Sequence, residues 1–212
     1  MAVQSKPDQP VFVSPEEYLA FERASEFRHE YHGGEVVAMS GATFEHNRVS
    51  GNFFALLWIG LRGGSCQAFT SDMRVGIPRS RRYFYPDITA VCGEPEFEDG
   101  VLDTLLNPVL VVEVLSESTE GFDRGEKFLR YQRIESLREY VLVSQTSAVV
   151  ERFARAGEDW TYHAALGRDA TITLESVGVT LRLADVYEGV ETPGDDRDDE
   201  RGDTPPDGRD GN

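Results

Sequence analysis

Residues 108–131, which read PVLVVEVLSESTEGFDRGEKFLRY, decide how the rest of the chain is interpreted. The first part is a run of valine and leucine side chains that is interrupted by a single carboxylate, that of Glu113. A run of this length and composition is typical of a strand buried on both faces. Because burying an unpaired, ionised carboxylate is costly, Glu113 must be protonated, paired with a cation or bound to a metal ion.

A helix is expected directly after this strand. The hydroxyls of Ser-Glu-Ser-Thr can cap it, and Lys127, Tyr131 and Ile134 fall at i, i+4 and i+7 on one helical face. A second acid in a strand-like apolar run is Asp87, which follows Tyr-Phe-Tyr-Pro and precedes Ile-Thr-Ala-Val. Asp87, Glu113 and Lys127 together suggest a functional site.

The first third of the chain predicts two helices and a hairpin. Ser14-Pro15-Glu16-Glu17 is a capping box with proline at the first helical position, and the helix should end near Ala24. Strands are expected over 27–31 and 35–39 around a Gly-Gly turn, with Glu35 on the return. Residues 42–62 have helical periodicity, which places His46 on the inward face.

Strands dominate the remainder, which favours an α/β (α+β) fold class with a central mixed β-sheet flanked by helices and additional β-hairpins. A basic loop, Pro-Arg-Ser-Arg-Arg, precedes the Asp87 strand and contains Arg79, Arg81 and Arg82. Short strands are expected over residues 66–69, 73–77, 88–91, 139–144, 148–154, 160–165, 170–174 and 179–183.

Length and composition predict one domain over residues 1–190 and an acidic, disordered C-terminal tail over 191–212. The formal net charge of −17 argues against broad attraction to nucleic acid, so such a partner would need a small basic patch and bound divalent cations. No apolar run is long enough to span a bilayer and the N-terminus lacks a secretory core, so a cytoplasmic protein without membrane contact is expected. Cys66 and Cys92 match no metal-binding spacing and are expected to be free thiols.

The chain resembles the Uma-type restriction endonuclease family, a branch of the PD-(D/E)XK nuclease superfamily. The resemblance extends from about Phe12 to Val190 and depends on the order and spacing of several short motifs. These motifs are GGEVVAMSGAT, HNRVSGN, SDMRV, YPDITAV, NPVLVVEVLSEST, DRGEKFLRY and SLREYVLV. The resemblance implies a restriction-endonuclease-like fold.

The resemblance also implies a metal-dependent active site. Asp87 and Glu113 would bind Mg²⁺, with Mn²⁺ as a possible substitute, and a lysine would help to activate the water that attacks a phosphodiester. The usual lysine position, two residues after Glu113, holds Leu115 here, and Lys127 on the following helix matches the lysine of this branch. We expect Glu35 to be a third carboxylate at the metal.

Several other residues have both a functional and a structural interpretation. His46 and Tyr131 could support or line the site, or could simply be packed in the core. Arg79, Arg81 and Arg82 could contact substrate phosphates or could be solvated loop residues. Asp87 and Glu113 could instead form structural ion pairs with a basic side chain such as Lys127.

The leading functional hypothesis is a Mg²⁺-dependent endonuclease that hydrolyses phosphodiester bonds in DNA. One alternative is a catalytically silent nuclease-fold protein that acts as a binding or regulatory partner, and another is a metal-dependent phosphodiesterase acting on a small nucleotide. DNA is the expected partner rather than RNA, and a homodimer is expected by analogy with nucleases of this fold. No separate DNA-reading module is visible in the sequence.

Overall fold

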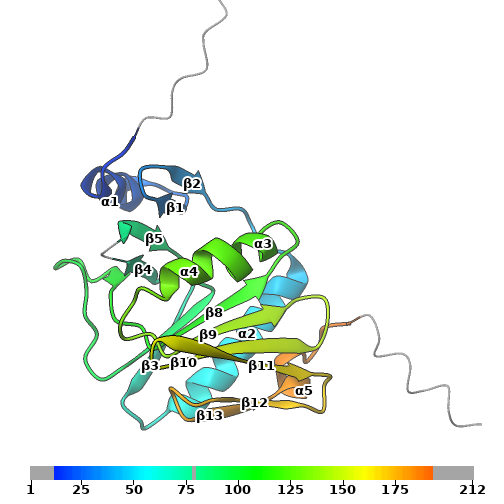
Figure 1. Cartoon of the computed structure of the whole chain (residues 1–212). Helices are drawn as coiled ribbons and strands as arrows, with labels where there is room; N and C mark the ends of the chain where they lie inside the picture. The colour runs from blue at the N-terminus through cyan, green and yellow to red at the C-terminus, as the bar shows by residue number, and fades with distance from the viewer. Residues whose placement is uncertain (1–11, 78–79, 193–212) are drawn as a thin grey trace, which may run out of the picture.

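The computed structural model describes residues 12–77 and 80–192 of the chain. Within these residues the strands form three sheets (Figure 1). Most of the acidic tail, residues 193–212, and Arg79 lie outside the described residues. In the described residues no helix is long and apolar enough to cross a membrane.

The largest sheet is built around the strand of Glu113. Its order is β11 (Asp159–Leu166), β10 (Val149–Ala156), β9 (Glu139–Ser144), β8 (Leu110–Leu115), β6 (Ile88–Cys92) and β3 (Cys66–Thr70). β8 pairs parallel with β9 and antiparallel with β6, so the sheet is mixed, as the sequence predicts. Every residue of β8 is buried, which confirms the interpretation of its apolar run.

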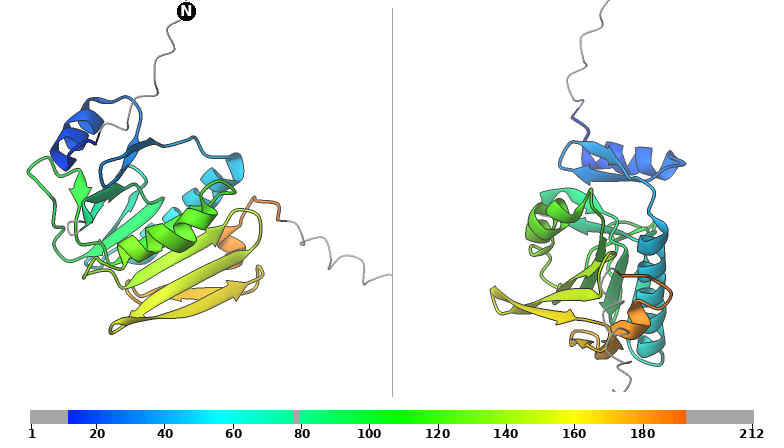
Figure 2. Two further views of the ribbon diagram at one scale, coloured as in Figure 1. Left: turned by 45° about the horizontal axis from the view of Figure 1, so that its top comes forward. Right: turned by 90° about the vertical axis from the view of Figure 1, so that its right-hand side faces the viewer.

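Both faces of this sheet are covered (Figure 2, right), which is why β8 lacks alternating polar residues. On one face, Val112 and Val114 pack in a core with α2 (Phe44–Leu61), the two-stranded sheet of β12 (Thr171–Leu174) and β13 (Val179–Arg182), and α5 (Leu183–Val186). On the other face, Val111 and Leu115 pack against Phe128 and Tyr131 of the segment that follows β8. Glu113 alternates with Val112 and Val114 and therefore belongs to this second face.

The segment after β8 is helical but is not one regular helix. It consists of α3 (Glu120–Phe122), a π-helical turn η2 (Asp123–Lys127) and α4 (Phe128–Tyr131), where the sequence predicts one helix over 121–134. Lys127, Tyr131 and Ile134 are all buried, so the helical face that the sequence predicts them to share is the inward face of this segment. π-helical turns inside α-helices are often found at functional sites.

A second sheet has five strands, which are the two strands of the N-terminal hairpin and three later strands. Its order is β2 (Val36–Ala38), β1 (His29–His32), β5 (Arg82–Phe84), β4 (Arg74–Ile77) and β7 (Thr104–Leu105). α1 (Pro15–Ala24) begins with the predicted capping box between Ser14 and Glu17. Tyr18 of α1 stacks on Tyr31 of β1 and Tyr83 of β5, which fixes the helix to this sheet. The β1–β2 hairpin thereby faces the segment after β8 (Figure 1).

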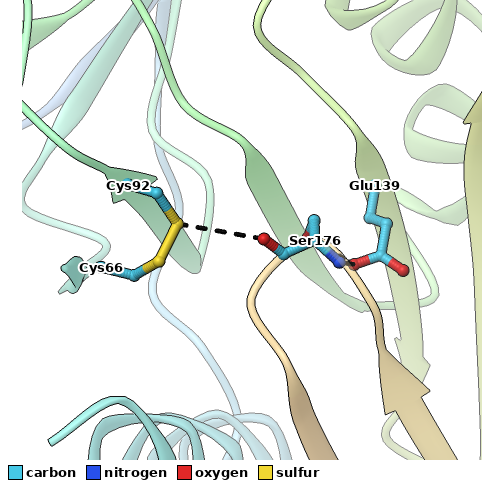
Figure 3. The surroundings of a disulfide bond; sticks show 4 residues. All are labelled: Cys66, Cys92, Glu139 and Ser176. Carbon is cyan, nitrogen blue, oxygen red and sulfur yellow. Dashed lines mark hydrogen bonds between the residues drawn. A yellow bond between two sulfur atoms is a disulfide. The ribbon is translucent and has the colours of Figure 1, made fainter. Parts of the chain in front are cut away.

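The expectation of free thiols is wrong, because Cys66 and Cys92 form a disulfide (Figure 3). The two cysteines are direct partners in the antiparallel pairing of β3 and β6. They are separated by 26 positions in the sequence, so only the sheet register reveals that they meet. The bond ties the edge strand β3 to the strand that follows Asp87.

Candidate functional site

Asp87 and Glu113 are brought together by the pairing of β6 with β8. Ile88 lies opposite Val112 in this pair, so Asp87, at the entrance of β6, lies beside the part of β8 that carries Glu113. The Val114 N–H donates a hydrogen bond of 2.7 Å to Asp87 Oδ2. This bond fixes the Asp87 carboxylate next to the Glu113 backbone.

Lys127 pairs with Glu113, which is one of the three possibilities that the sequence leaves open for this buried acid. Its Nζ lies 2.9 Å from Glu113 Oε1, and the side chain is only 7% exposed. Nζ also lies 3.3 Å from Glu30 Oε1 and 3.5 Å from Asp123 Oδ1. One ammonium therefore serves three carboxylates that come from β8, β1 and the π-helical turn.

Tyr131 supports Glu113 from the same helical face as Lys127. Its hydroxyl donates a hydrogen bond of 3.2 Å to Glu113 Oε1, and the residue is fully buried. Tyr131 does not line the cleft described below, so it acts on the site through Glu113.

His46 reaches the site from the N-terminal turn of α2. Thr43 caps that helix by accepting a hydrogen bond from the His46 N–H. His46 Nε2 lies 3.4 Å from Asp87 Oδ2, and the side chain is 14% exposed, which confirms its predicted inward position. Its Nδ1 is buried and has no hydrogen-bond partner among the described residues. Burial alone would lower the pKa of His46, but its hydrogen bond to Asp87 and the charge of that carboxylate raise the pKa.

A cleft of about 880 Å³ lies over these residues. Part of its wall is apolar and comes from Val37 and Met39 of the β1–β2 hairpin region and from Phe122 of α3. Its charged and histidine lining residues are Arg28, Glu30, His32, His46, Asp87, Glu113, Glu117, Asp123 and Lys127. The size and shape fit a concave binding site.

The electrostatics of the cleft are set by burial and by an excess of acids. Burial raises the pKa of Glu113 well above its usual value, and the charges of Asp123 and Asp87 act in the same direction. Burial also raises the pKa of Asp123. For Lys127, burial alone would lower the pKa, but the charges of Glu113 and Glu30 outweigh it and raise the pKa. The lysine is therefore a permanent cation in this site.

Glu30 differs from the other two acids around the lysine. Burial pushes its pKa upward, but the charge of Lys127 and hydrogen bonds from His32 and the Tyr85 N–H outweigh burial and lower the pKa. The Tyr85 N–H donates to Glu30 Oε1 over 3.2 Å. Glu30 is thus the carboxylate of the cluster that stays ionised most readily.

The donor set fits a hard divalent cation that keeps part of its water shell. Among the described residues no three His, Cys, Asp or Glu side chains are grouped closely enough to hold a metal ion by themselves. Mg²⁺ does not need such a group, because it is commonly bound by one or two carboxylates, water and a substrate phosphate. Asp87 and Glu113 both line the cleft, and the charge of Asp87 adds to burial in raising the pKa of Glu113, so a cation held by these two carboxylates would offset that charge.

The structure does not bring Glu35 to this cluster. Glu35 lies after the Gly33-Gly34 turn, is exposed, and does not line the cleft. Glu30, on the opposite strand of the same hairpin, occupies the position beside Lys127 instead. Of the basic loop, Arg81 is exposed and Arg82 lies in β5, and neither lines the cleft.

Two residues of the cluster, Glu30 and Asp123, were missed by the sequence analysis. Asp123 precedes Lys127 by four positions and therefore falls on the same helical face, which is a signal that the sequence contains. Glu30 alternates with the buried Tyr31 in β1. No local feature distinguishes it from Glu35.

The sheet topology and the cluster of acids around one lysine define a restriction-endonuclease-like protein. The chain matches the family model described as "Uma2: Putative restriction endonuclease" over residues 15–184, and it belongs to that family. The resemblance stated from the sequence is thereby confirmed, and this membership supports nuclease function.

Two uncharacterized proteins of Synechocystis sp. are similar in sequence. One, sll1609, is 37% identical over 157 residues, which cover 74% of this chain and 89% of that protein. The other, slr1290, is 34% identical over 179 residues, which cover 84% of this chain and 93% of that protein.

A solved structure has the same fold. It is described as a putative nuclease belonging to DUF820 from Anabaena variabilis and superposes with a TM-score of 0.69 at 15% identity. The match covers 83% of this chain and 98% of that chain. The predicted restriction-endonuclease-like fold is therefore confirmed.

Proposed function

We propose that this protein is a Mg²⁺-dependent endonuclease that hydrolyses phosphodiester bonds in DNA, with Mn²⁺ as an alternative cofactor. The observation that carries the proposal is the cluster at the cleft: Asp87 and Glu113 on paired strands, with Lys127 Nζ 2.9 Å from Glu113. Family membership gives the reaction class, and the cluster gives the residues that would perform it.

Asp87 and Glu113 would hold the metal ion. When bound there, Mg²⁺ supplies Lewis-acid polarisation of the phosphate and offsets the charge that develops in the transition state. The Val114 N–H holds the Asp87 carboxylate in place, and Tyr131 holds that of Glu113. These hydrogen bonds orient the two carboxylates before a substrate arrives, which lowers the cost of reorganisation.

Lys127 would orient the attacking water and stabilise negative charge on the phosphate. Its ammonium is almost completely buried and is held by Glu113, Glu30 and Asp123, so its position is fixed from three directions. His46 would hold the Asp87 carboxylate from the side of α2.

The first test is calorimetric titration with Mg²⁺ and then Mn²⁺, comparing the wild type with the Asp87→Asn, Glu113→Gln double variant. We expect binding in the wild type and none in the double variant. Cleavage of DNA and RNA substrates is then measured with each metal ion. Absence of metal binding by the wild type, even with DNA present, would contradict the proposal and favour a role as a catalytically silent partner protein.

A further inference from the structure

Three arginines gather outside the cleft, where β5 meets the helical segment that carries Lys127. Arg82 of β5 and Arg130 of α4 both contact Glu126 Oε1, at 3.4 Å and 3.0 Å from their Nη2 atoms. Burial lowers the pKa of Arg82, and the positive charges of Arg130 and Arg133 lower it further. Arg130 and Arg133 therefore both lie close enough to Arg82 to repel its guanidinium group.

The arginine cluster, defined as Arg82, Arg130 and Arg133, has unused hydrogen-bond donors. Arg130 Nε is buried without a hydrogen-bond partner among the described residues. The Arg133 side chain is exposed and makes no ion pair or hydrogen bond within residues 12–77 and 80–192. Glu126 is the carboxylate that lies between Arg82 and Arg130, and its side chain is 48% exposed. An anion with several oxygens would satisfy more of these donors than this carboxylate does.

The arginine cluster adjoins the cleft. Arg82 is the register partner of His32, which lines the cleft, and its guanidinium lies against Gly33 in the β1–β2 turn. Glu126 directly precedes Lys127, whose ammonium is in the cleft. The helical face with Lys127 therefore points into the cleft, and the adjacent face of the same segment carries Arg130 and Arg133.

A cluster of arginines is unusual in this chain, because the chain is strongly acidic. The formal net charge is −17, and in the cleft the acids outnumber the lysine and arginine residues. A nucleic-acid strand must nevertheless be held by contacts to its phosphates, which provide most of the affinity in such complexes. Arginine is suited to this task because its planar guanidinium binds phosphate through two hydrogen bonds.

We propose that Arg82, Arg130 and Arg133 bind a backbone phosphate of the nucleic-acid strand beside the scissile position, and that Glu126 occupies this phosphate site until the strand displaces it. This inference rests on the proposed function, because it takes the substrate to be a nucleic-acid strand. Glu126 keeps the arginines in place and also competes with the phosphate for them. Because the recognised group is the phosphodiester itself, DNA and RNA strands are both ligands of the site.

The test is a binding measurement in EDTA, where no metal-dependent cleavage occurs, with labelled single-stranded DNA, duplex DNA and RNA of equal length. Fluorescence anisotropy is recorded over a range of salt concentrations for Arg82→Gln, Arg130→Gln and Arg133→Gln. We expect each variant to bind about tenfold more weakly. The slope of log affinity against log salt should fall in each variant, by at most about 0.7 for single strands and about 0.9 for duplex, because the three arginines share one phosphate.

Glu126→Gln should change the binding affinity in the opposite direction. This variant therefore distinguishes the inference from a general effect of lost positive charge. Removal of the competing carboxylate should tighten binding of every strand severalfold. The matched control is Arg182→Gln, which removes an exposed arginine from β13, at the far end of the molecule from the β1–β2 hairpin (Figures 1 and 2). Its affinity and salt slope should equal those of the wild type. Arg133→Gln removes no ion pair and no side-chain hydrogen bond within the described residues, so it should fold normally even if Arg130→Gln does not.

Unchanged salt slopes in the three arginine variants, or no tightening in Glu126→Gln, would overturn the inference, as would absence of binding by the wild type. Similar affinity for single-stranded DNA and RNA would support recognition of the phosphate alone, and strict dependence on one of them would overturn it. Failure of this inference can be distinguished from failure of the proposed function, because the proposed function is decided by metal-dependent cleavage and its loss in Glu113→Gln.

Discussion

Glu113 and Glu139 are two acids in otherwise apolar strands, and they have opposite surroundings. They lie on the adjacent parallel strands β8 and β9, and they are 3% and 1% exposed. Glu139 accepts hydrogen bonds from the Glu175 N–H, the Ser176 N–H and the Ser176 hydroxyl, and Arg152 lies beside it. Figure 3 shows Glu139 pointing toward Ser176.

Glu113, in contrast, has few hydrogen-bond donors around it and several other acids. It accepts hydrogen bonds from Lys127 and Tyr131, and it shares that lysine with Glu30 and Asp123 while Asp87 lies close by. A buried carboxylate surrounded by donors, such as Glu139, is a structural clamp between β9 and the loop that follows β12. A buried carboxylate among other acids at a cleft, such as Glu113, is where we propose that a cation binds.

The largest expected difference between these two acids is in catalysis. Glu113→Gln should lower the rate of phosphodiester cleavage by about 10²–10³-fold, because a proposed ligand of the metal ion that polarises the phosphate is lost. Glu139→Gln should leave the rate per folded molecule unchanged, because Glu139 does not line the cleft. Cleavage assays of both variants, normalised to the folded fraction measured by circular dichroism, provide the comparison. An equal loss of cleavage rate in the two variants would show that Glu113 and Glu139 do not differ in their role in catalysis.

The second difference is in stability. Glu139→Ala should lower the free energy of unfolding by about 3 kcal/mol, because buried N–H donors and Arg152 would lose their acceptor. Glu113→Gln should cost less than about 1 kcal/mol, because the amide oxygen can still accept hydrogen bonds and Lys127 keeps its two other carboxylate partners. Urea denaturation measures both changes. Glu175→Ala, at a mostly exposed neighbour of Glu139, is the control and should cost no more than about 0.5 kcal/mol.

The third difference is in the pH dependence of stability. The pKa of Glu113 is raised in the folded state, so its contribution to stability is fully present below the unfolded value of about 4.5 and is lost as pH rises through the folded pKa. Lys127 stays protonated throughout this range because its pKa is also raised. The wild type should therefore lose about 1.4 kcal/mol relative to Glu113→Gln for each unit by which the two pKa values of Glu113 differ. Urea denaturation between pH 4 and 9 tests this expectation; parallel curves would contradict it.

The smallest difference concerns the hydroxyl that supports Glu113. Tyr131→Phe should cost about 1 kcal/mol of unfolding free energy in the wild type and less when Glu113 is already glutamine. Tyr140→Phe is a matched control, because the Tyr140 hydroxyl donates instead to the backbone carbonyl of Asp123. A double-mutant cycle in urea should show coupling to Glu113 for Tyr131 and none for Tyr140. Equal coupling for both tyrosines would show that Tyr131 has no specific role at Glu113.

Features that depend on neighbouring residues in the chain were predictable from the sequence. The Ser14–Glu17 capping box, the buried β8 run and the shared helical face of Lys127, Tyr131 and Ile134 are all present in the structure. Each follows from periodicity or capping chemistry within one turn or one strand. The grouping of Asp87, Glu113 and Lys127 in one site was also expected, from two acids in apolar runs, one lysine on the following helix and the family resemblance.

Features that depend on pairing between distant segments were not predictable. Glu30, rather than Glu35, lies beside Lys127 because β1 pairs with β5. In this pairing Tyr31 lies opposite Tyr83. The same limitation hid the disulfide, since Cys66 and Cys92 meet only through the β3–β6 register. The π-helical turn at Asp123–Lys127 is a further case, because its sequence is compatible with an ordinary α-helix.

The disulfide has a topological consequence for the chain. It closes a covalent ring between Cys66 and Cys92 that contains β4, β5 and Asp87. A protease that cuts the backbone once inside this ring leaves two fragments joined through sulfur, and they separate on a gel only after reduction. Asp87 therefore stays covalently attached to both halves of the chain even after the backbone that connects them has been severed.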